Sequence, residues 1–177
     1  MTERKLILYI AMSLDGYIAT PEGELDFLSV VEKEGEDYGY TAFVETIDTV
    51  IMGRKTYEKV LSLGVALPHA DKTLYIITRT QKHGFENVIF FSGEIKTLLE
   101  EIRKKDGKHI YCDGGAEIVD ILLKENLIDE IVVSVIPVLL GSGIPLFRQG
   151  RNTQNLSLIE SKSFEKGLVQ LHYRAGK

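Results

Sequence analysis

The chain has 177 residues, of which 44% are hydrophobic and 27% are charged, and its formal net charge is −5. This length is enough for one well-packed core and short for two, so we expect a single domain over residues 1–177. The acidic balance argues against a nucleic-acid-binding surface, which normally carries a basic patch.

The amino-terminal residues argue against two further classes. Residues 1–5 lead into an apolar stretch that covers only residues 6–12, which predicts neither a signal peptide nor a membrane span. We therefore expect a cytoplasmic protein with no membrane partner. The single cysteine, Cys112, lies in an apolar segment and is predicted to be a core residue. The histidines lack metal-ligand spacing, so no metal is expected.

Hydrophobic periodicity predicts the elements along the chain. Strands are predicted over residues 5–12, 49–52, 73–78, 88–91, 109–112, 131–138, 156–164 and 168–174. Helices are predicted over residues 37–46, 56–63, 94–105 and 116–125. Strands alternate with helices until the last third, where strands follow one another. This pattern is typical of a mainly parallel sheet with an antiparallel edge.

The segment over residues 20–37 is rich in glycine and in acidic side chains. Its charged residues are Glu22, Glu24, Asp26, Glu32, Lys33, Glu34, Glu36 and Asp37. A phosphorylated substrate would be repelled here unless the segment turns its charges outward. We expect most of these carboxylates to be solvated and at most one to take part in chemistry.

The first glycine motif follows the apolar strand over residues 49–52. Gly53 allows a sharp turn, and the first amides of the next helix lack backbone partners. Those amides and the positive end of the helix dipole attract anionic oxygen, and Arg54 and Lys55 add positive charge. The alternative is a plain strand-to-helix turn with solvated basic residues.

The second glycine motif follows the strand over residues 109–112. Gly114 and Gly115 leave room for a ligand to approach the main chain, and a helix begins directly after them. The motif lacks the G-x-G-x-x-G spacing of the doubly wound dinucleotide fold, and a Gly-Gly pair is also found in ordinary turns. Two phosphate-binding turns in one small domain together indicate a dinucleotide.

The sequence leaves two alternative interpretations for each of two segments in the last third of the chain. The loop over residues 141–147 is glycine-rich and is either a ligand contact or a surface turn. The long apolar strand over residues 131–140 either supplies a dimer interface or lies inside the sheet.

Taken in order, these motifs resemble the dihydrofolate reductase superfamily, and within it the stand-alone relatives of the riboflavin-biosynthesis reductase domain. The resemblance covers nearly the full length. It rests on residues 11–19 (AMSLDGYIA), 50–57 (VIMGRKTY), 77–79 (ITR), 113–117 (DGGAE), 127–130 (LIDE) and 137–147 (PVLLGSGIPLF).

The resemblance implies a three-layer α/β fold in which helices cover both faces of a central eight-stranded sheet. That sheet is mostly parallel, with an antiparallel carboxy-terminal edge. The resemblance also implies NADPH as the cofactor, a small heterocycle as the substrate and a homodimer as the assembly.

The resemblance assigns four groups of cofactor-binding residues. The loop and helix start that meet the phosphates correspond to Gly53, Arg54, Lys55 and Thr56, and the pyrophosphate turn to Gly114, Gly115, Ala116 and Glu117. The turn beside the adenosine 2′-phosphate corresponds to Thr78 and Arg79, and the wall near the nicotinamide to Ala11, Ile18 and Ala19. A cation at Arg79 fits selection of NADPH over NADH, although a surface arginine at a strand end is the alternative.

Three carboxylates are considered as the proton source. Dihydrofolate reductase carries an acid on the helix before the Gly-Arg strand, and the matching place here is Asp37. Asp37 would share a helical face with Tyr40, although an Asp at a helix start is often just an N-cap. Asp26 is the second catalytic candidate, and Asp15 before Gly16 is expected to form a turn.

The sequence thus predicts an NADPH-dependent reductase that transfers a hydride to a pyrimidine or pteridine-like ring. The reference activity is reduction of 5-amino-6-(5-phosphoribosylamino)uracil in riboflavin biosynthesis. Dihydrofolate reduction is one alternative, and a non-catalytic NADPH-binding module is another. The chain departs from both relatives, because it has no tryptophan and no basic cluster outside the cofactor motifs for a ribose phosphate.

Overall fold

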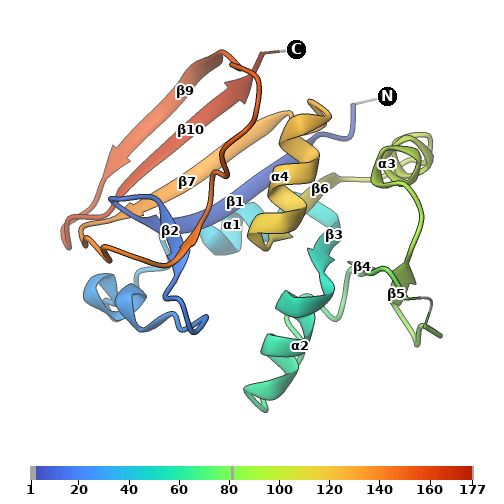
Figure 1. Cartoon of the computed structure of the whole chain (residues 1–177), viewed down its shortest axis with the longest axis horizontal. Coiled ribbons are helices and arrows are strands. Elements are labelled where there is room, and N and C mark those ends of the chain that lie inside the picture. The colour runs from blue at the N-terminus through green and yellow to red at the C-terminus, as the bar shows by residue number, and fades with distance from the viewer. Residues whose placement is uncertain (1–2, 81, 177) are drawn as a thin grey trace.

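The computed structural model describes residues 3–80 and 82–176 (Figure 1). The strands are β1 (Leu6–Ser13), β2 (Tyr17–Ala19), β3 (Ile47–Gly53), β4 (Thr73–Ile77), β5 (Val88–Phe91), β6 (His109–Gly114), β7 (Glu130–Ile136), β8 (Ile144–Pro145), β9 (Leu156–Ser163) and β10 (Val169–Ala175). The helices are the 3₁₀ helix η1 (Asp26–Val31) and the α-helices α1 (Tyr40–Glu45), α2 (Arg54–Ser62), α3 (Ile95–Arg103) and α4 (Ala116–Lys124).

An 8-stranded sheet forms the centre of the molecule, in the order β5-β4-β3-β6-β1-β7-β10-β9. Every pair from β5 to β7 is parallel, whereas β10 runs antiparallel to both β7 and β9. The predicted parallel sheet with an antiparallel carboxy-terminal edge is therefore confirmed. The parallel strands all end at the same edge, which we call the carboxyl edge.

Helices cover both faces of the sheet, because the parallel strands are apolar on both sides. Ile51 of β3 packs in one cluster with buried residues of α3 and α4, while its neighbours Val50 and Met52 pack on the other face, beside Tyr57 of α2. In Figure 1, α4 crosses in front of the sheet and α1 lies behind it. The result is the three-layer arrangement that the sequence predicts.

The segment before α1 differs from the prediction. A helix was expected over residues 37–46, but α1 begins only at Tyr40. Tyr38 has a φ of 56° and Gly39 a φ of 84°, and such left-handed residues cannot belong to a right-handed helix. The segment over residues 20–37 also contains η1, whose Phe27 and Val31 are buried. Periodicity missed η1 because it is only a short 3₁₀ turn.

The loop over residues 141–147 is partly a strand. β8 pairs with β2 in a separate 2-stranded sheet. A Cβ on Gly143 would lie 2.3 Å from the carbonyl oxygen of Ala19, so this close approach requires glycine.

The strand proposed as a dimer interface lies inside the sheet. β7 has β1 on one side and β10 on the other, and its residues are almost all buried. The alternative of an interior strand is therefore the correct one for Glu130–Ile136. The homodimer itself stays a prediction. Among the residues that the structure describes, no helix has the length and apolar character needed to cross a bilayer.

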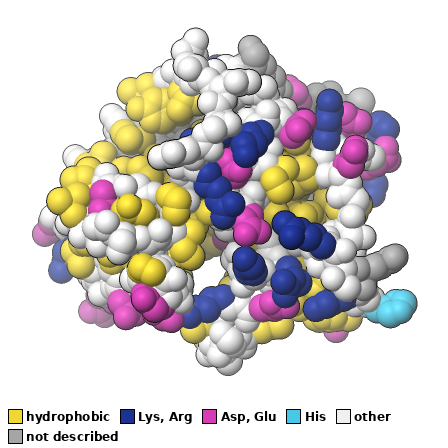
Figure 2. Space-filling model, viewed as in Figure 1, with side chains coloured by type: hydrophobic (Ala, Val, Ile, Leu, Met, Phe, Trp, Pro, Cys, Tyr) yellow, Lys and Arg dark blue, Asp and Glu magenta, His cyan; other side chains and the backbone are white. Residues whose placement is uncertain are grey.

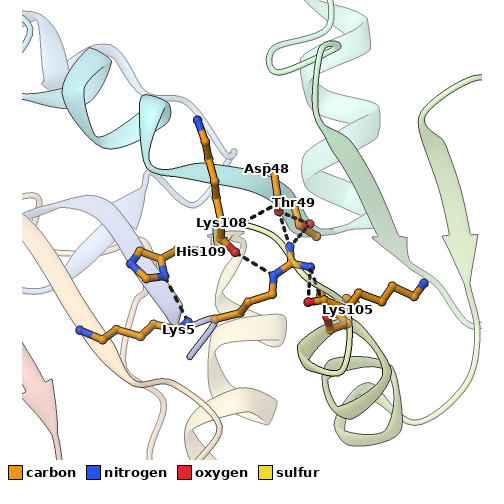
Figure 3. Close-up of polar contacts among 8 residues, drawn as sticks. Lys5, Asp48, Thr49, Lys105, Lys108 and His109 are labelled. Carbon is orange, nitrogen blue, oxygen red and sulfur yellow. Dashed lines mark hydrogen bonds and ion pairs between the residues drawn. The ribbon is translucent and has the colours of Figure 1, made fainter. Parts of the chain in front are cut away.

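A polar network connects several segments at the edge of the sheet where the parallel strands begin, which we call the amino edge. Arg4 is 6% exposed, and its guanidinium pairs with the Asp48 carboxylate and donates to the Thr49 hydroxyl at 2.9 Å. It also donates to the carbonyl oxygens of Lys108 at 2.7 Å and Lys105 at 3.5 Å. Figure 3 shows how these partners converge from β3 and from the connection between α3 and β6. This network lies at the opposite edge from the carboxyl ends of the strands.

Candidate cofactor and substrate site

The two glycine motifs lie side by side at the carboxyl edge. β3 and β6 are neighbours in the sheet, with Met52 opposite Gly114. Gly53 is the N-cap of α2, and Gly115 is the N-cap of α4. The first amides of two helices therefore open toward the same place. We call residues 53–56 and 114–117 together the glycine cradle.

There is little space in the cradle for a side chain at the glycine positions. A Cβ on Gly115 would lie 3.1 Å from Thr56 Oγ1, and a Cβ on Gly53 would lie 3.0 Å from Ile118 Cγ1. Gly114 has a φ of 99°, which side chains with a Cβ rarely adopt. The cradle is thus a concave main-chain surface that a larger residue would fill.

Basic side chains outnumber acidic ones around the cradle. Glu58 contacts both Arg54 (2.7 Å) and Lys82 (3.8 Å), and Glu117 contacts both Lys55 (3.3 Å) and Arg148 (3.8 Å). Figure 2 shows dark blue side chains gathered around a hollow in this face of the molecule. The excess positive charge and the helix amides together favour an anionic group such as a diphosphate.

Thr78 and Arg79 follow β4, the strand next to β3 on the side away from β6. Thr78 is buried, and its hydroxyl accepts a bond from the Thr80 amide at 3.2 Å. Arg79 is exposed and makes no ion pair within residues 3–80 and 82–176. Arg79 therefore lies at the carboxyl edge, as the cradle does, and it follows the strand next to β3.

The residues expected near the nicotinamide do not all pack together. Ala11 lies on β1 beside the cluster that contains η1, whereas Ile18 packs with the cluster beneath α3 and α4. Ala19 ends β2 and is 6% exposed. Their contact with a nicotinamide stays a prediction.

A pocket of about 460 Å³ lies over β1 and β7, on the face covered by α1 and η1. We call it the ring pocket. Its lining consists of Tyr9, Ala11, Leu28, Val31, Glu32, Lys33, Glu34, Glu36, Asp37, Tyr38, Ser134, Ile136 and Leu168. Apolar side chains form most of its inner surface, and the charged residues all come from residues 32–37.

A hydrogen-bond network holds the polar part of the pocket lining. The Gln170 side-chain amide donates to the Tyr9 hydroxyl at 3.0 Å and to Ser134 Oγ at 3.1 Å. Tyr9 in turn donates to the carbonyl oxygen of Tyr38 at 3.0 Å. These bonds therefore connect β1, β7 and β10 to the segment before α1.

Asp37 lines the ring pocket, although not from a helix as predicted. Its carboxylate accepts bonds from the amides of Gly39 at 2.9 Å and Thr41 at 3.0 Å. Bonds from the Thr41 side chain and from these two amides lower the pKa of Asp37 below its ordinary value. Asp37 therefore stabilises the start of α1 from outside the helix, while the N-cap position itself is Gly39, so the predicted N-cap role is not confirmed as such. Its carboxyl is ionised near neutral pH.

The other two carboxylates lie elsewhere. Asp26 is exposed at the start of η1, and it is not among the described residues that line the ring pocket. Asp15 accepts bonds from Ser13 Oγ at 2.5 Å and from the Gly141 amide at 2.7 Å. It thus ties the end of β1 to the loop over residues 141–147, in agreement with its expected role in a turn.

Asp113 is a candidate that the motif analysis did not single out. It lies at the end of β6, directly before the glycine cradle, and the Tyr111 hydroxyl donates to it at 2.6 Å. Burial raises the pKa of Asp113 above its ordinary value, although Tyr111 and His69 oppose the shift. A protonated carboxyl can serve as a proton donor. The available signal was an acidic residue between an apolar strand and two glycines.

Aromatic residues surround Asp113. Tyr111 is 3% exposed, and its ring packs edge-on against Phe43 and His69. His69 Nε2 lies 2.9 Å from the Tyr40 hydroxyl, and burial lowers the pKa of this histidine. The described residues contain no group of His, Cys, Asp and Glu side chains that is arranged for a metal ion. The chemistry around Asp113 is therefore that of a half-buried carboxyl group near phenols and an imidazole.

Comparison with known proteins identifies the family. The model of the RibD C-terminal domain matches residues 4–170. YwjB, an uncharacterized protein of Bacillus subtilis, is 45% identical over 172 residues, which are 97% of this chain and 98% of YwjB. The crystal structure of a candidate riboflavin biosynthesis protein from Shewanella sp. PV-4 is 34% identical, with a TM-score of 0.89, over 98% of this chain and 99% of that one.

A dihydrofolate reductase from Enterococcus faecalis, complexed with NADP(H), shares the fold. It is 17% identical, with a TM-score of 0.69, over 98% of this chain and 97% of that one. The family match extends over both glycine turns and over most of the sheet. This chain belongs to the RibD C-terminal domain family and has the dihydrofolate reductase-like fold.

Proposed function

We propose that this protein is an NADPH-dependent reductase that transfers a hydride to a small pyrimidine or pteridine-like ring. The observation that carries the proposal is the juxtaposition of the α2 and α4 N-termini in one glycine cradle with excess positive charge. Family membership supports the same class of reaction.

The cradle suits the phosphates of a dinucleotide. The amides of Arg54, Lys55 and Thr56 and those after Gly115 would bind the diphosphate, because glycine leaves the main chain open there. Thr78 and Arg79 would bind the 2′-phosphate. Ala11, Ile18 and Ala19 would line the nicotinamide, which supplies the hydride when bound.

The proton has three candidate sources within the chain. We favour Asp113, because burial raises its pKa and it directly precedes the cradle. Asp37 is ionised and lines the ring pocket, so it suits acceptance of a bond from a ring N–H better than donation of a proton. Asp26 is the least favoured, since it is exposed at the start of η1 and, unlike Asp113, does not adjoin the cradle. Neither Asp26 nor Asp113 is among the described residues that line the ring pocket.

The reference activity is the reduction of 5-amino-6-(5-phosphoribosylamino)uracil, and dihydrofolate reduction is the alternative. A non-catalytic NADPH-binding module would share the cradle but would not oxidise the cofactor. We expect the homodimer to be the working assembly.

A spectrophotometric assay tests this proposal. The protein is incubated with NADPH and a panel of aminopyrimidines and pteridines, and the absorbance of the reduced nicotinamide is followed. We expect at least one ring to cause NADPH oxidation in proportion to enzyme concentration. Tight NADPH binding without oxidation across the panel would favour the binding module, and failure to bind NADPH would contradict both proposals.

A further inference from the structure

The ring pocket combines an apolar interior with an acidic rim. The rim carboxylates are Glu32, Glu34, Glu36 and Asp37, which are exposed and line the pocket. Lys33 is the one cation among the described lining residues, and it forms an ion pair with Glu165. The segment before α1 thus gathers exposed carboxylates around the pocket.

The interior of the pocket is mainly apolar. Tyr9 and Ala11 of β1 and Ile136 of β7 form one side, and η1 contributes Leu28 and Val31. A volume of about 460 Å³ is in the range of small-molecule sites. These features point to a ligand independently of the acidic rim.

One buried polar group in the lining is partly free. Ser134 is 6% exposed, and its hydroxyl accepts the bond from Gln170. Its own hydrogen is donated to no other residue in the described ranges, so it is available to a ring carbonyl or ring nitrogen.

The backbone amides beside the pocket that could bind an anion already have a partner. The amides at the start of α1 bind the Asp37 carboxylate of the chain itself. A phosphate in this pocket would therefore meet four carboxylates and one paired lysine, without a free helix amide or an arginine among the described lining residues. The glycine cradle has the opposite character, because its cations exceed its carboxylates.

We propose that the ring pocket binds the reducible substrate and selects a planar ring that is neutral or cationic and carries no phosphate. This inference rests on the proposed reductase function, and it restricts the substrates of that reductase to rings without a phosphate. The cradle binds the phosphates of the cofactor, whereas the carboxylates of the rim disfavour a substrate that itself carries a phosphate. The phosphorylated aminopyrimidine would then be a poor ligand of this chain, even though it is the reference substrate of the reaction type.

Matched ligand pairs test the selection. The dissociation constants of 5-amino-6-ribosylaminouracil and its 5′-phosphate, and of neopterin and neopterin monophosphate, are measured by calorimetry with the full chain saturated with NADP⁺. We expect the unphosphorylated member of at least one pair to bind about ten-fold tighter or more, because like charges are brought together by the phosphate. The difference should shrink as salt is raised from 0.05 to 0.5 M.

A variant assigns the effect to the rim. E32Q/E34Q/E36Q should tighten the phosphorylated ligand by about ten-fold and leave the unphosphorylated one within about two-fold. The control E100Q/E125Q/E160Q removes the same formal charge at exposed positions outside the described pocket lining, and it should change neither.

Two results would overturn the inference: equal or tighter binding of the phosphorylated member in both pairs, or no binding of any of the four ligands at millimolar concentration. Failure of the proposed function is separate, because it would appear as absent NADPH oxidation and not in these binding constants.

Discussion

Asp113 and Asp37 are the same chemical group in opposite environments. Burial raises the pKa of Asp113, while hydrogen bonds from the Thr41 side chain and from two amides lower that of Asp37. A raised pKa keeps a carboxyl protonated to higher pH, so Asp113 loses its proton at a higher pH than Asp37 does. Their roles in the proposed reduction should differ accordingly.

The pH dependence of turnover tests the role of Asp113. As a proton donor it is active when protonated, so kcat should be highest at low pH and should fall as the pH rises through the raised pKa. Asp113→Asn should lower kcat by about 10²–10⁴-fold and remove this dependence, without changing the Kd of NADPH. Asp37→Asn is the matched control, and it should raise KM for the ring more than it lowers kcat. Wild-type turnover in Asp113→Asn would return the assignment to Asp37, to Asp26 or to water.

Arg79 carries the expected cofactor preference. It is exposed at the carboxyl edge, where a single charged contact with the 2′-phosphate would distinguish NADPH from NADH. Arg79→Ala should weaken NADPH by about 1.5–3 kcal/mol and change NADH little, as measured by fluorescence titration of both cofactors. Equal weakening of the two would show that Arg79 does not read the 2′-phosphate.

At the scale of elements, the carboxyl edge combines two helix starts that belong to different βα units. Gly115 has a φ of −73°, which lies outside the left-handed region that favours glycine. The constraint on a side chain at Gly115 is the 3.1 Å approach of its Cβ to Thr56 Oγ1. The small size of glycine therefore keeps the gap between the starts of α2 and α4 open.

Gly115→Ala should close this space. We expect its Kd for NADPH to rise about 10–150-fold, which corresponds to about 1.5–3 kcal/mol, the value of a lost charge-assisted contact, while the melting temperature changes little. Gly150→Ala is the control, since Gly150 lies in open space but has a φ of 83°. That variant should lose stability and keep its affinity. Unchanged NADPH binding in Gly115→Ala would argue against the cradle.

The elements and the site differ in how far the sequence predicted them. The central strands were predictable because each is an apolar run between turn residues, and the position of the glycine cradle because its glycines come directly between a strand and a helix. The start of α1 was not, since Tyr38 is a non-glycine residue with positive φ. The ring pocket and the raised pKa of Asp113 arise from contacts between segments far apart in the chain, for which local patterns hold no signal.

Across the whole molecule, the Arg4 network and the proposed cofactor site lie at opposite edges of the sheet. The Arg4 network fastens β3 and the turn before β6 at the amino edge. The cradle and the ring pocket divide the other functions by charge, with cations at the cradle and carboxylates at the pocket rim. A change at the amino edge should therefore affect folding without affecting the cofactor.

Asp48→Ala tests this separation. It leaves the buried Arg4 guanidinium without its carboxylate, so we expect the free energy of unfolding to fall by about 2–3 kcal/mol, less than for a fully buried pair because Asp48 is 37% exposed. Asp71→Ala, which breaks an exposed ion pair with Lys72, should cost less than about 0.5 kcal/mol. Urea denaturation measures both. Loss of NADPH affinity in folded Asp48→Ala would contradict the separation of the two edges.

The central claim is that both glycine turns hold the two halves of one dinucleotide. A crystal structure of the protein with NADP⁺ tests it most directly. We predict one cofactor molecule, with its diphosphate on the amides after Gly115 and at the start of α2, its 2′-phosphate at Arg79 and its nicotinamide toward Ala11. A cofactor that engages one turn and leaves the other free, or that binds elsewhere on the sheet, would contradict the account.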